Sequence, residues 1–389
     1  MNGKDSAGST SLLVLMQYDS SNSRVFRALL QQQKLDVNAV AEGGETALII
    51  ATRHYCSRYV KGCFRSETLV TIRALLKHPE LNVNAKDDKG LTAFSHVSLA
   101  RHSEVLCEFL KHDDVDVNER FKNGETALIR ACLATYISID MVRELLKHNK
   151  LDGNAKDDEG YTAFMRACLN TGLGVVLNWW EHDDVNVAHD SLERDNLDVI
   201  CKLLNHDGVD VNAKTDCGDT ALLLTIHRYS RSTEVFFFGL TEQGGVTERY
   251  TDGRHQRKLD IVLLLLAHKK IDVNAADDQG RTPFYWASHY GCCEIVREML
   301  KNEKVDVNVR DASGNTPLIS ACLNGRLGVV RMLLEHEKVD VHVMKTSGLT
   351  ALDIARNHGM PEITQCLEEY FNVCCKETSG NSKRKRKFS

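Results

Sequence analysis

The sequence lacks any apolar run long enough to cross a membrane. Near the N-terminus, only the short apolar stretch 12–16 follows the lone basic residue Lys4, which is too short for the core of a secretory signal. The chain has 13 cysteines but no Cys-x-x-Cys pair. Small secreted domains are usually short and have an even number of cysteines. We therefore expect reduced thiols in a cytoplasmic or nuclear protein with no membrane partner.

Motifs of the common enzyme families are also missing. The sequence has no G-x-x-x-x-G-K-[ST] phosphate loop, no G-x-S-x-G elbow and no H-E-x-x-H metal motif. Catalytic pairs that assemble from distant parts of the chain would leave no such motif. The absences nevertheless favour a protein that is not an enzyme, with no catalytic residues, no cofactor and no metal site.

Charge is nearly balanced over the chain, with 49 Lys and Arg against 54 Asp and Glu. An unbroken basic run stands near the C-terminus: Lys383, Arg384, Lys385, Arg386 and Lys387. Without these five residues, 44 basic residues face 54 acidic ones, a net charge of −10. The acidic remainder argues against a body that binds nucleic acid. The run itself is typical of a nuclear localisation signal, a solubilising tail or a weak phosphate contact, and we favour nuclear import.

What the sequence does contain is a repeated pattern. An Asp-Val-Asn-Ala phrase recurs in eight copies with the same internal spacing, some of them altered by a residue or two. A Thr stands eight residues after the third position of every copy, and a Gly stands two residues before every Thr. The threonines are Thr46, Thr92, Thr126, Thr162, Thr220, Thr282, Thr316 and Thr350, and the glycines are Gly44, Gly90, Gly124, Gly160, Gly218, Gly280, Gly314 and Gly348.

Each part of this unit has a physical reading. The Gly suits a tight turn that needs positive φ, and the Thr hydroxyl is placed to cap the helix that follows. Pro283 and Pro317 come directly after their Thr, at the first helical position, where a missing N–H costs nothing. A short apolar inner helix and an amphipathic outer helix follow, and an extended loop, here called the finger, leads to the next unit. Neither helix pair can bury its apolar face alone, so neighbouring units must stack.

These residues resemble the ankyrin repeat family over about residues 10–372. The spacing of 34 residues from Asn84 to Asn118 and from Asn274 to Asn308 is close to the family period. The fourth-position His of the family signature is replaced, for example by Ser95 and Tyr285, which puts the family's inter-repeat histidine hydrogen bonds in doubt. The resemblance implies an all-α helix-turn-helix solenoid of about ten repeats, one of them truncated, that binds another protein on its concave face.

The repeat spacing is interrupted in three places. Only 24 residues separate Ala188 from Asn212, which predicts a repeat without its inner helix, with Trp179 and Trp180 filling the space or with a hinge at this point. Two longer steps predict insertions between helices, the second with Phe236, Phe237 and Phe238 in a surface loop or a docking loop. The expected organisation is a disordered N-terminus (1–9), a first sub-array (10–187, insertion about 53–67), a short segment with a missing inner helix (188–196), a second sub-array (197–372, insertion about 228–258) and a disordered basic tail (373–389).

Histidines and cysteines recur at fixed positions of the repeat. Seven outer helices end in His: His78, His112, His148, His182, His206, His268 and His336. Packed helices lie about 8–10 Å apart, whereas Zn–N bonds are about 2 Å, so equivalent histidines should not converge on one ion. A His at a helix C-terminus can instead bond the last carbonyls. Cys132, Cys168 and Cys322 share an inner-helix position where a small apolar residue packs.

The family resemblance also points to a candidate binding surface on the fingers and the inner helices. The partner would be another protein of unknown identity, and we expect the chain to be a monomer. Tyr161 and Tyr290 are the preferred anchors, because aromatic side chains carry much of the energy of interfaces. The alternative is a nuclear or nucleic-acid-associated regulator that uses the basic tail. The candidate contact residues are Lys122, Asn123, Glu125, Asp158, Glu159, Tyr161, Asp278, Gln279, Arg281, His289, Tyr290, Ser313 and Asn315, joined by Leu169, Asn170, Ala312, Leu323 and Asn324.

Overall fold

The computed structural model describes residues 10–18, 23–32, 35–57, 62–100, 102–133, 139–170, 188–232 and 253–378. These residues form helices and loops, with two isolated β-bridges and no strand. The helices are α1 (Ser11–Tyr18), α2 (Ser23–Leu30), α3 (Ala47–Cys56), α4 (Gly62–Leu76), α5 (Ala93–Ala100), α6 (Ser103–Phe109), the short 3₁₀ helix η1 (Lys122–Gly124), α7 (Ala127–Leu133), α8 (Ile139–Leu146), α9 (Ala163–Leu169), α10 (Ala188–Asn205), α11 (Ala221–Ser232), α12 (Gly253–Ala267), α13 (Pro283–Tyr290), α14 (Cys293–Leu300), α15 (Pro317–Leu323), α16 (Leu327–Glu335), α17 (Ala351–Asn357) and α18 (Pro361–Thr378).

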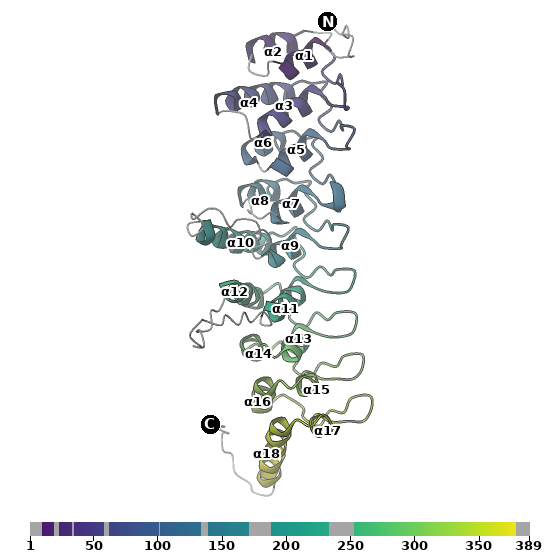
Figure 1. Cartoon of the computed structure of the whole chain (residues 1–389), viewed down its shortest axis with the longest axis vertical. Helices are drawn as coiled ribbons and strands as arrows, with labels where there is room; N and C mark the ends of the chain where they lie inside the picture. Colours follow the sequence, from purple (N-terminus) through teal and green to yellow (C-terminus); the bar gives the residue numbers. More distant parts are fainter. Residues whose placement is uncertain are drawn as a thin grey trace, which may run out of the picture. The chain divides into compact units, whose positions relative to one another are not determined.

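The chain divides into two compact units, Met1–Val209 and Asp210–Ser389. Within each unit the helices are arranged in pairs (Figure 1), in which an odd-numbered inner helix packs against the even-numbered outer helix that follows it. Inner helices also pack on the inner helices of neighbouring pairs, as α7 does on α5 and α9, and α15 does on α13 and α17. The fingers project from the inner-helix side of each unit (Figure 1). The all-α repeat fold predicted from the sequence is confirmed.

The start of each inner helix follows the sequence pattern. In all eight copies the Thr hydroxyl accepts a hydrogen bond from the backbone N–H three residues on, as Thr282 does from Tyr285 at 3.3 Å and Thr316 from Ile319 at 3.3 Å. All eight glycines have φ between 70° and 82°. The predicted cap and turn are therefore confirmed at every copy.

Neighbouring repeats are tied together by the finger asparagines. The Asn118 side chain donates to the Lys150 carbonyl at 2.7 Å and accepts from the Asp152 N–H at 2.8 Å. In the second unit, Asn274 makes the same two bonds to Lys304 and Asp306. Because each amide satisfies one donor and one acceptor of the next loop, this ladder fixes the spacing of successive fingers.

The region predicted as a truncated repeat is described from residue 188 onward. Residues 188–196 belong to α10, and α10 packs on α8 and α9 as the outer helix of the α9 pair. The Asn154 side chain donates to the Gly208 carbonyl beyond α10 at 3.1 Å, so the ladder continues directly from one finger to the next. The sequence placed residues 197–206 at the start of the second sub-array; in the structure they belong to α10, which packs on α8 and α9, and the first compact unit ends after them at Val209. Trp179 and Trp180 lie outside the described residues.

The described parts of the two predicted insertions are mostly helical. The first is largely taken up by α3, which extends to Cys56, and by α4, which begins at Gly62. The second begins within α11 and ends within α12. Phe236, Phe237 and Phe238 lie outside the described residues, as do the N-terminal segment 1–9 and residues 379–389. The tail predicted to be disordered over 373–389 begins too early, because residues 373–378 belong to the helix α18. The sequence predicts about ten repeats, and the described residues contain nine helix pairs.

Candidate protein-binding surface

In the first unit, two neighbouring fingers bring together the candidate residues predicted there. The Asn123 carbonyl accepts a hydrogen bond from the Asp158 N–H at 3.0 Å, and Asn123 itself has φ of 69°. The Glu125 carboxylate pairs with Arg130 of α7 at 3.1 Å, whereas the Asp158 side chain is exposed. Lys122 lies in η1. These fingers therefore present backbone-ordered tips with few aromatic groups.

Tyr161 stands at the base of the same surface and is already in contact with a cation. The Arg166 guanidinium lies 4.3 Å from the centre of the Tyr161 ring. Arg166 also pairs with the buried Asp157 at 2.6 Å and with the exposed Glu159 at 3.0 Å. One face of the Tyr161 ring is thus covered, which reduces the area that a partner could bury on it.

The second unit carries a larger aromatic group, here called the anchor cluster: His227 of α11 and Tyr285, Trp286, His289 and Tyr290 of α13. The Trp286 and Tyr290 rings stack at 5.3 Å with an angle of 19° between them, and His227 meets Trp286 edge-on at 4.6 Å. The His227 ring also shares a hydrogen bond of 3.0 Å with the Tyr290 hydroxyl. All but the buried Tyr285 are half-buried, so the rings are held firmly yet partly face solvent.

Polar groups hold the anchor cluster in place. Asp277 accepts from the Trp286 indole at 3.1 Å and from the Arg281 side chain at 2.9 Å, and the Arg281 guanidinium lies 4.3 Å over the Trp286 ring. Burial alone raises the pKa of Asp277, but hydrogen bonds from the Arg281 N–H, the indole and the Gln279 N–H outweigh it and lower that pKa. Asp277 is therefore a fully bonded carboxylate that orients Trp286 from below.

The third repeat of the unit adds further contacts to the cluster. Tyr285 donates to the Asp311 carboxylate at 2.8 Å. His289 shares hydrogen bonds of 3.1 Å with Ser320 of α15 and with Asn324, the residue that follows α15. Burial, together with the Asp311 carboxylate, raises the pKa of Tyr285 to about 12, so its hydroxyl stays protonated. Burial and the nearby cations Arg326 and Arg281 lower the pKa of His289, which favours a neutral ring near pH 7.

The remaining candidates of the second unit build its finger tips. The Gln279 carbonyl accepts from the Ala312 N–H at 2.9 Å, and the Ser313 carbonyl accepts from Thr346. Asn315 donates to Asp311 at 2.9 Å, and Asp278 is exposed. Among the predicted residues, Arg281, His289 and Tyr290 thus join one cluster, while Gln279, Ser313 and Asn315 order the fingers beside it.

Sequence reasoning missed Trp286, His227 and Tyr285. Trp286 stands four residues after Thr282 and four before Tyr290, so it lies on the same helical stripe as the predicted Tyr290. His227 occupies the repeat position of His289 in the preceding repeat. Helical spacing from Tyr290 would have found Trp286, and comparing equivalent positions between repeats would have found His227.

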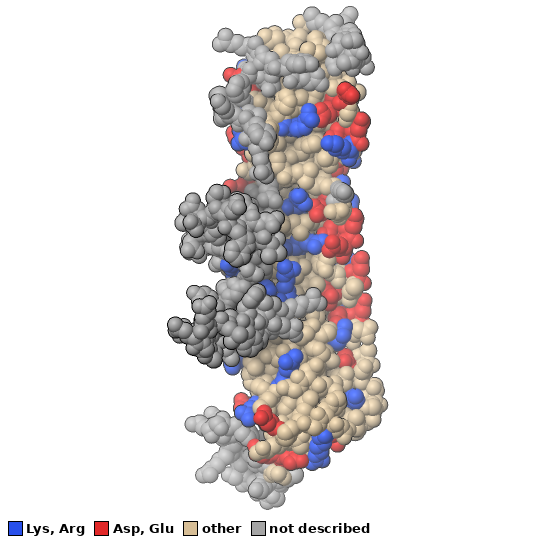
Figure 2. All heavy atoms as spheres, viewed as in Figure 1, with Lys and Arg blue, Asp and Glu red and all other residues tan. Residues whose placement is uncertain are grey.

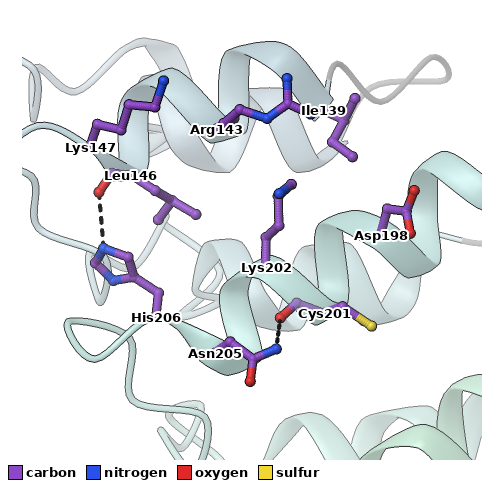
Figure 3. Close-up of a pocket in the computed structure, with 9 residues that line it drawn as sticks. All are labelled: Ile139, Arg143, Leu146, Lys147, Asp198, Cys201, Lys202, Asn205 and His206. Atoms are coloured by element: carbon purple, nitrogen blue, oxygen red, sulfur yellow. Dashed lines mark hydrogen bonds between the residues drawn. The ribbon is translucent and has the colours of Figure 1, made fainter.

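A hollow of about 630 Å³ lies between the outer helices α8 and α10 of the first unit (Figure 3), and the sequence did not predict it. Three of its lining groups are the cations Arg143, Lys147 and Lys202, of which the first two pair with Asp140 and Glu144. The His206 ring bonds the Leu146 carbonyl at 2.9 Å across it. Burial and Asp198 raise the pKa of the Cys201 thiol, so this thiol is a poor nucleophile.

The histidines at the ends of the outer helices have a structural role. The Nδ1 atoms of His78, His112, His148, His206 and His268 accept from the backbone N–H two residues on, at 3.1–3.4 Å. The prediction that these rings bond the last carbonyls of helices is met at His206, whose Nε2 lies 2.9 Å from the Leu146 carbonyl at the end of α8, whereas the Nδ1 atoms of all five accept from the following loop. Within the described ranges, no group of three or more His, Cys, Asp and Glu side chains is placed to hold a metal ion.

Thiol reactivity follows from burial. Burial raises the pKa of the Cys132 and Cys322 thiols to about 12. Burial and the neighbouring Cys132 also raise the pKa of the Cys168 thiol. Because the thiolate is the reactive form, maleimide at neutral pH should modify the exposed Cys217 before these three buried thiols, which should stay unmodified in the folded chain. Peptide mass spectrometry after a short pulse measures this order. Modification of Cys132 as fast as Cys217 would contradict the packing, and unfolding in urea should remove the difference.

Stacked helix pairs joined by glycine-turn fingers define a helical repeat protein. Comparison with protein families gives a finer result: a model of ankyrin repeats in three copies matches residues 62–157, 96–189 and 298–377, and one of ankyrin repeats in many copies matches 264–321. The chain belongs to the ankyrin repeat family. No curated protein was found to match it.

Proteins of this family generally use their repeats to bind other proteins. In the part of the chain that can be described, none of the helices combines the length and the apolar character that a membrane span requires. The basic run 383–387 lies outside the described residues, and nuclear or cytoplasmic localisation stays a prediction.

Proposed function

We propose that this chain is a non-enzymatic adaptor that holds a protein partner on the inner-helix surface of its second unit, with Trp286 and Tyr290 as the main anchors. The observation that carries the proposal is the anchor cluster itself. Trp, Tyr and Arg side chains dominate the energy of protein interfaces, above all where they are clustered and held in place. Here Trp286 and Tyr290 stack on each other, Arg281 lies over the Trp286 ring, and a hydrogen bond to Asp277 holds Arg281 in place.

Preorganisation strengthens the proposal. Hydrogen bonds from Trp286 to Asp277 and between Tyr290 and His227 fix both rings before any partner arrives. A partner that packs on them loses little side-chain entropy of this chain, which would otherwise cost about 0.5–1.5 kcal/mol for each ordered side chain. A monomeric protein has little reason to hold such a group half-exposed unless the group is used.

The first unit offers a weaker secondary surface. Its fingers carry Lys122, Asn123, Glu125, Asp158, Glu159 and Tyr161, and Figure 2 shows acidic and basic side chains interleaved along the finger side of this unit. Such mixed charge favours specificity and orientation more than affinity. We assign these residues to the polar rim of a partner contact, with Tyr161 contributing less than Tyr290 because Arg166 already covers its ring.

Affinity capture with quantitative mass spectrometry tests the proposal. Full-length wild type should retain a partner that full-length Trp286→Ala loses, and the Kd measured with that purified partner should rise at least about tenfold, the loss typical of an interface anchor. Tyr370→Ala is the matched control, because it removes a half-buried aromatic side chain from the outer helix α18 of the same unit. If Trp286→Ala kept full affinity while its circular dichroism was unchanged, the anchor cluster would not be the binding site.

A further inference from the structure

The charges around the anchor cluster are unevenly satisfied. Asp277 accepts four hydrogen bonds, from the N–H groups of Gln279 and Arg281, the Arg281 side chain and the Trp286 indole. Asp311 is bonded in the same way by the N–H groups of Ser313 and Asn315 and by the Asn315 amide and the Tyr285 hydroxyl. Both carboxylates are therefore committed to the fold and have little capacity left for a partner.

Arg326 differs from these groups. It is exposed, and among the described residues no carboxylate lies within ion-pair distance of its guanidinium. Its Nε donates to the His289 carbonyl at 3.1 Å, which places the charge at the C-terminal end of α13, beside the cluster. Its stem lies across Gly291, where a Cβ atom would come within 2.8 Å of the Arg326 Cδ. The missing side chain at position 291 thus gives Arg326 its place.

Arg281 contributes a second cation to the cluster. Its Nε donates to the Asp277 carboxylate at 2.9 Å, and its guanidinium carbon lies 4.3 Å from the centre of the Trp286 ring. Arg281 and Arg326 are both close enough to His289 to disfavour its protonation, in addition to the effect of burial. The charge of Arg281 is balanced by its ion pair with Asp277, so Arg326 supplies the positive charge beside the stacked rings that no carboxylate of the described residues pairs.

From this arrangement we propose that the anchor cluster recognises a protein segment in which an aromatic or aliphatic side chain stands next to an Asp or Glu. The apolar side chain packs on Trp286 and Tyr290, and the carboxylate pairs with Arg326. Guanidinium groups suit carboxylates because their N–H groups match the two oxygens. This inference rests on the proposed function, since it names the chemistry of the partner at the same site.

Random peptides displayed on phage provide the probe. Peptides selected on the full-length chain should be enriched in Asp or Glu next to a large apolar residue. The strongest should bind in fluorescence anisotropy with an affinity that falls as salt is added, because the charges are exposed. Arg326→Gln should weaken binding about fivefold, the scale of one exposed charge pair. Arg297→Gln, which removes an exposed arginine from the outer helix α14, should leave affinity unchanged.

The outcomes separate this inference from the proposed function. The inference would be overturned if the selected peptides lose binding to Trp286→Ala but carry no carboxylate and bind Arg326→Gln as tightly as wild type. That outcome would leave the proposed binding site in place. Peptides that bind Trp286→Ala as well as wild type would overturn both. A thermal melt of Arg326→Gln shows whether the loss of its bond to α13 also destabilises the fold. Equal weakening of acidic and neutral peptides in that variant would contradict a direct charge contact.

Discussion

Replacing Gly314 with Ala is expected to destabilise the second unit by about 2–4 kcal/mol, more than the same change at Gly348. Both glycines have positive φ, 76° and 78°, so either alanine incurs about 1–2 kcal/mol of left-handed strain. At Gly314 a Cβ atom would also lie 2.9 Å from the Thr346 nitrogen of the next finger, whereas at Gly348 nothing lies within 4 Å. The Thr346 backbone would have to move away, and its N–H and hydroxyl would lose their bonds to the Ser313 carbonyl.

Urea unfolding followed by circular dichroism measures the two losses. Hydrogen exchange with mass spectrometry then locates them. Gly314→Ala should speed exchange in the finger 344–349, because its Cβ atom pushes on the Thr346 backbone. Gly348→Ala makes no contact with a neighbouring finger, so its effect should come from strain within its own turn. Equal destabilisation by the two variants would show that left-handed strain accounts for the whole effect. The comparison therefore isolates the contact between neighbouring fingers from the turn within one finger.

The sequence predicted most of what is local in this fold. Thr282 and its seven equivalents cap their helices as predicted, because the cap depends only on residues three apart. The α9–α10 repeat could not be predicted in the same way. Residues 171–187 lie outside the described residues, and the packing of α10 on α8 and α9 is a tertiary contact that no local motif specifies.

The same limit applies to the candidate surface. Arg281, His289 and Tyr290 were found by their repeat positions, but Trp286 was missed because a large aromatic residue on a short helix also fits a core position. His227 enters the cluster from α11, more than 50 residues before α13, with an intervening segment of unusual length. The contact between them follows from the stacking of inner helices, which the spacing of the motifs alone does not specify.

The fourth position of the repeat shows how a missing family feature is replaced. Ser95 and Tyr285 stand where the family signature has His, and each makes a bond to the next repeat: Ser95 to Glu119 at 2.6 Å and Tyr285 to Asp311 at 2.8 Å. Inter-repeat bonds therefore persist at these two positions with different chemistry. In the first unit the replacement depends on a single buried carboxylate.

Glu119→Ala should cost the first unit about 2 kcal/mol. Other fingers carry a small residue here, such as Ala85 and Ala155, but the Glu119 side chain reaches back to the preceding repeat and is only 5% exposed. It accepts from the hydroxyls of Thr92 at 2.5 Å and Ser95 at 2.6 Å, at the cap of α5. Hydrogen bonds to a buried charge contribute about 1.5–3 kcal/mol each, and part of this offsets the cost of burying the carboxylate.

Thermal or urea unfolding of Glu119→Ala, Ser95→Ala and the double variant tests this assignment. Because the two residues share one bond, the double variant should lose about 1 kcal/mol less than the sum of the single variants. Glu144→Ala is the control, since its ion pair with Lys147 is more exposed and should contribute about 0.5 kcal/mol or less. If Glu119→Ala left stability unchanged or raised it, the cost of burying this charge would equal or exceed the bonds it makes, and alanine, the residue of most other fingers, would be the better fit at this position.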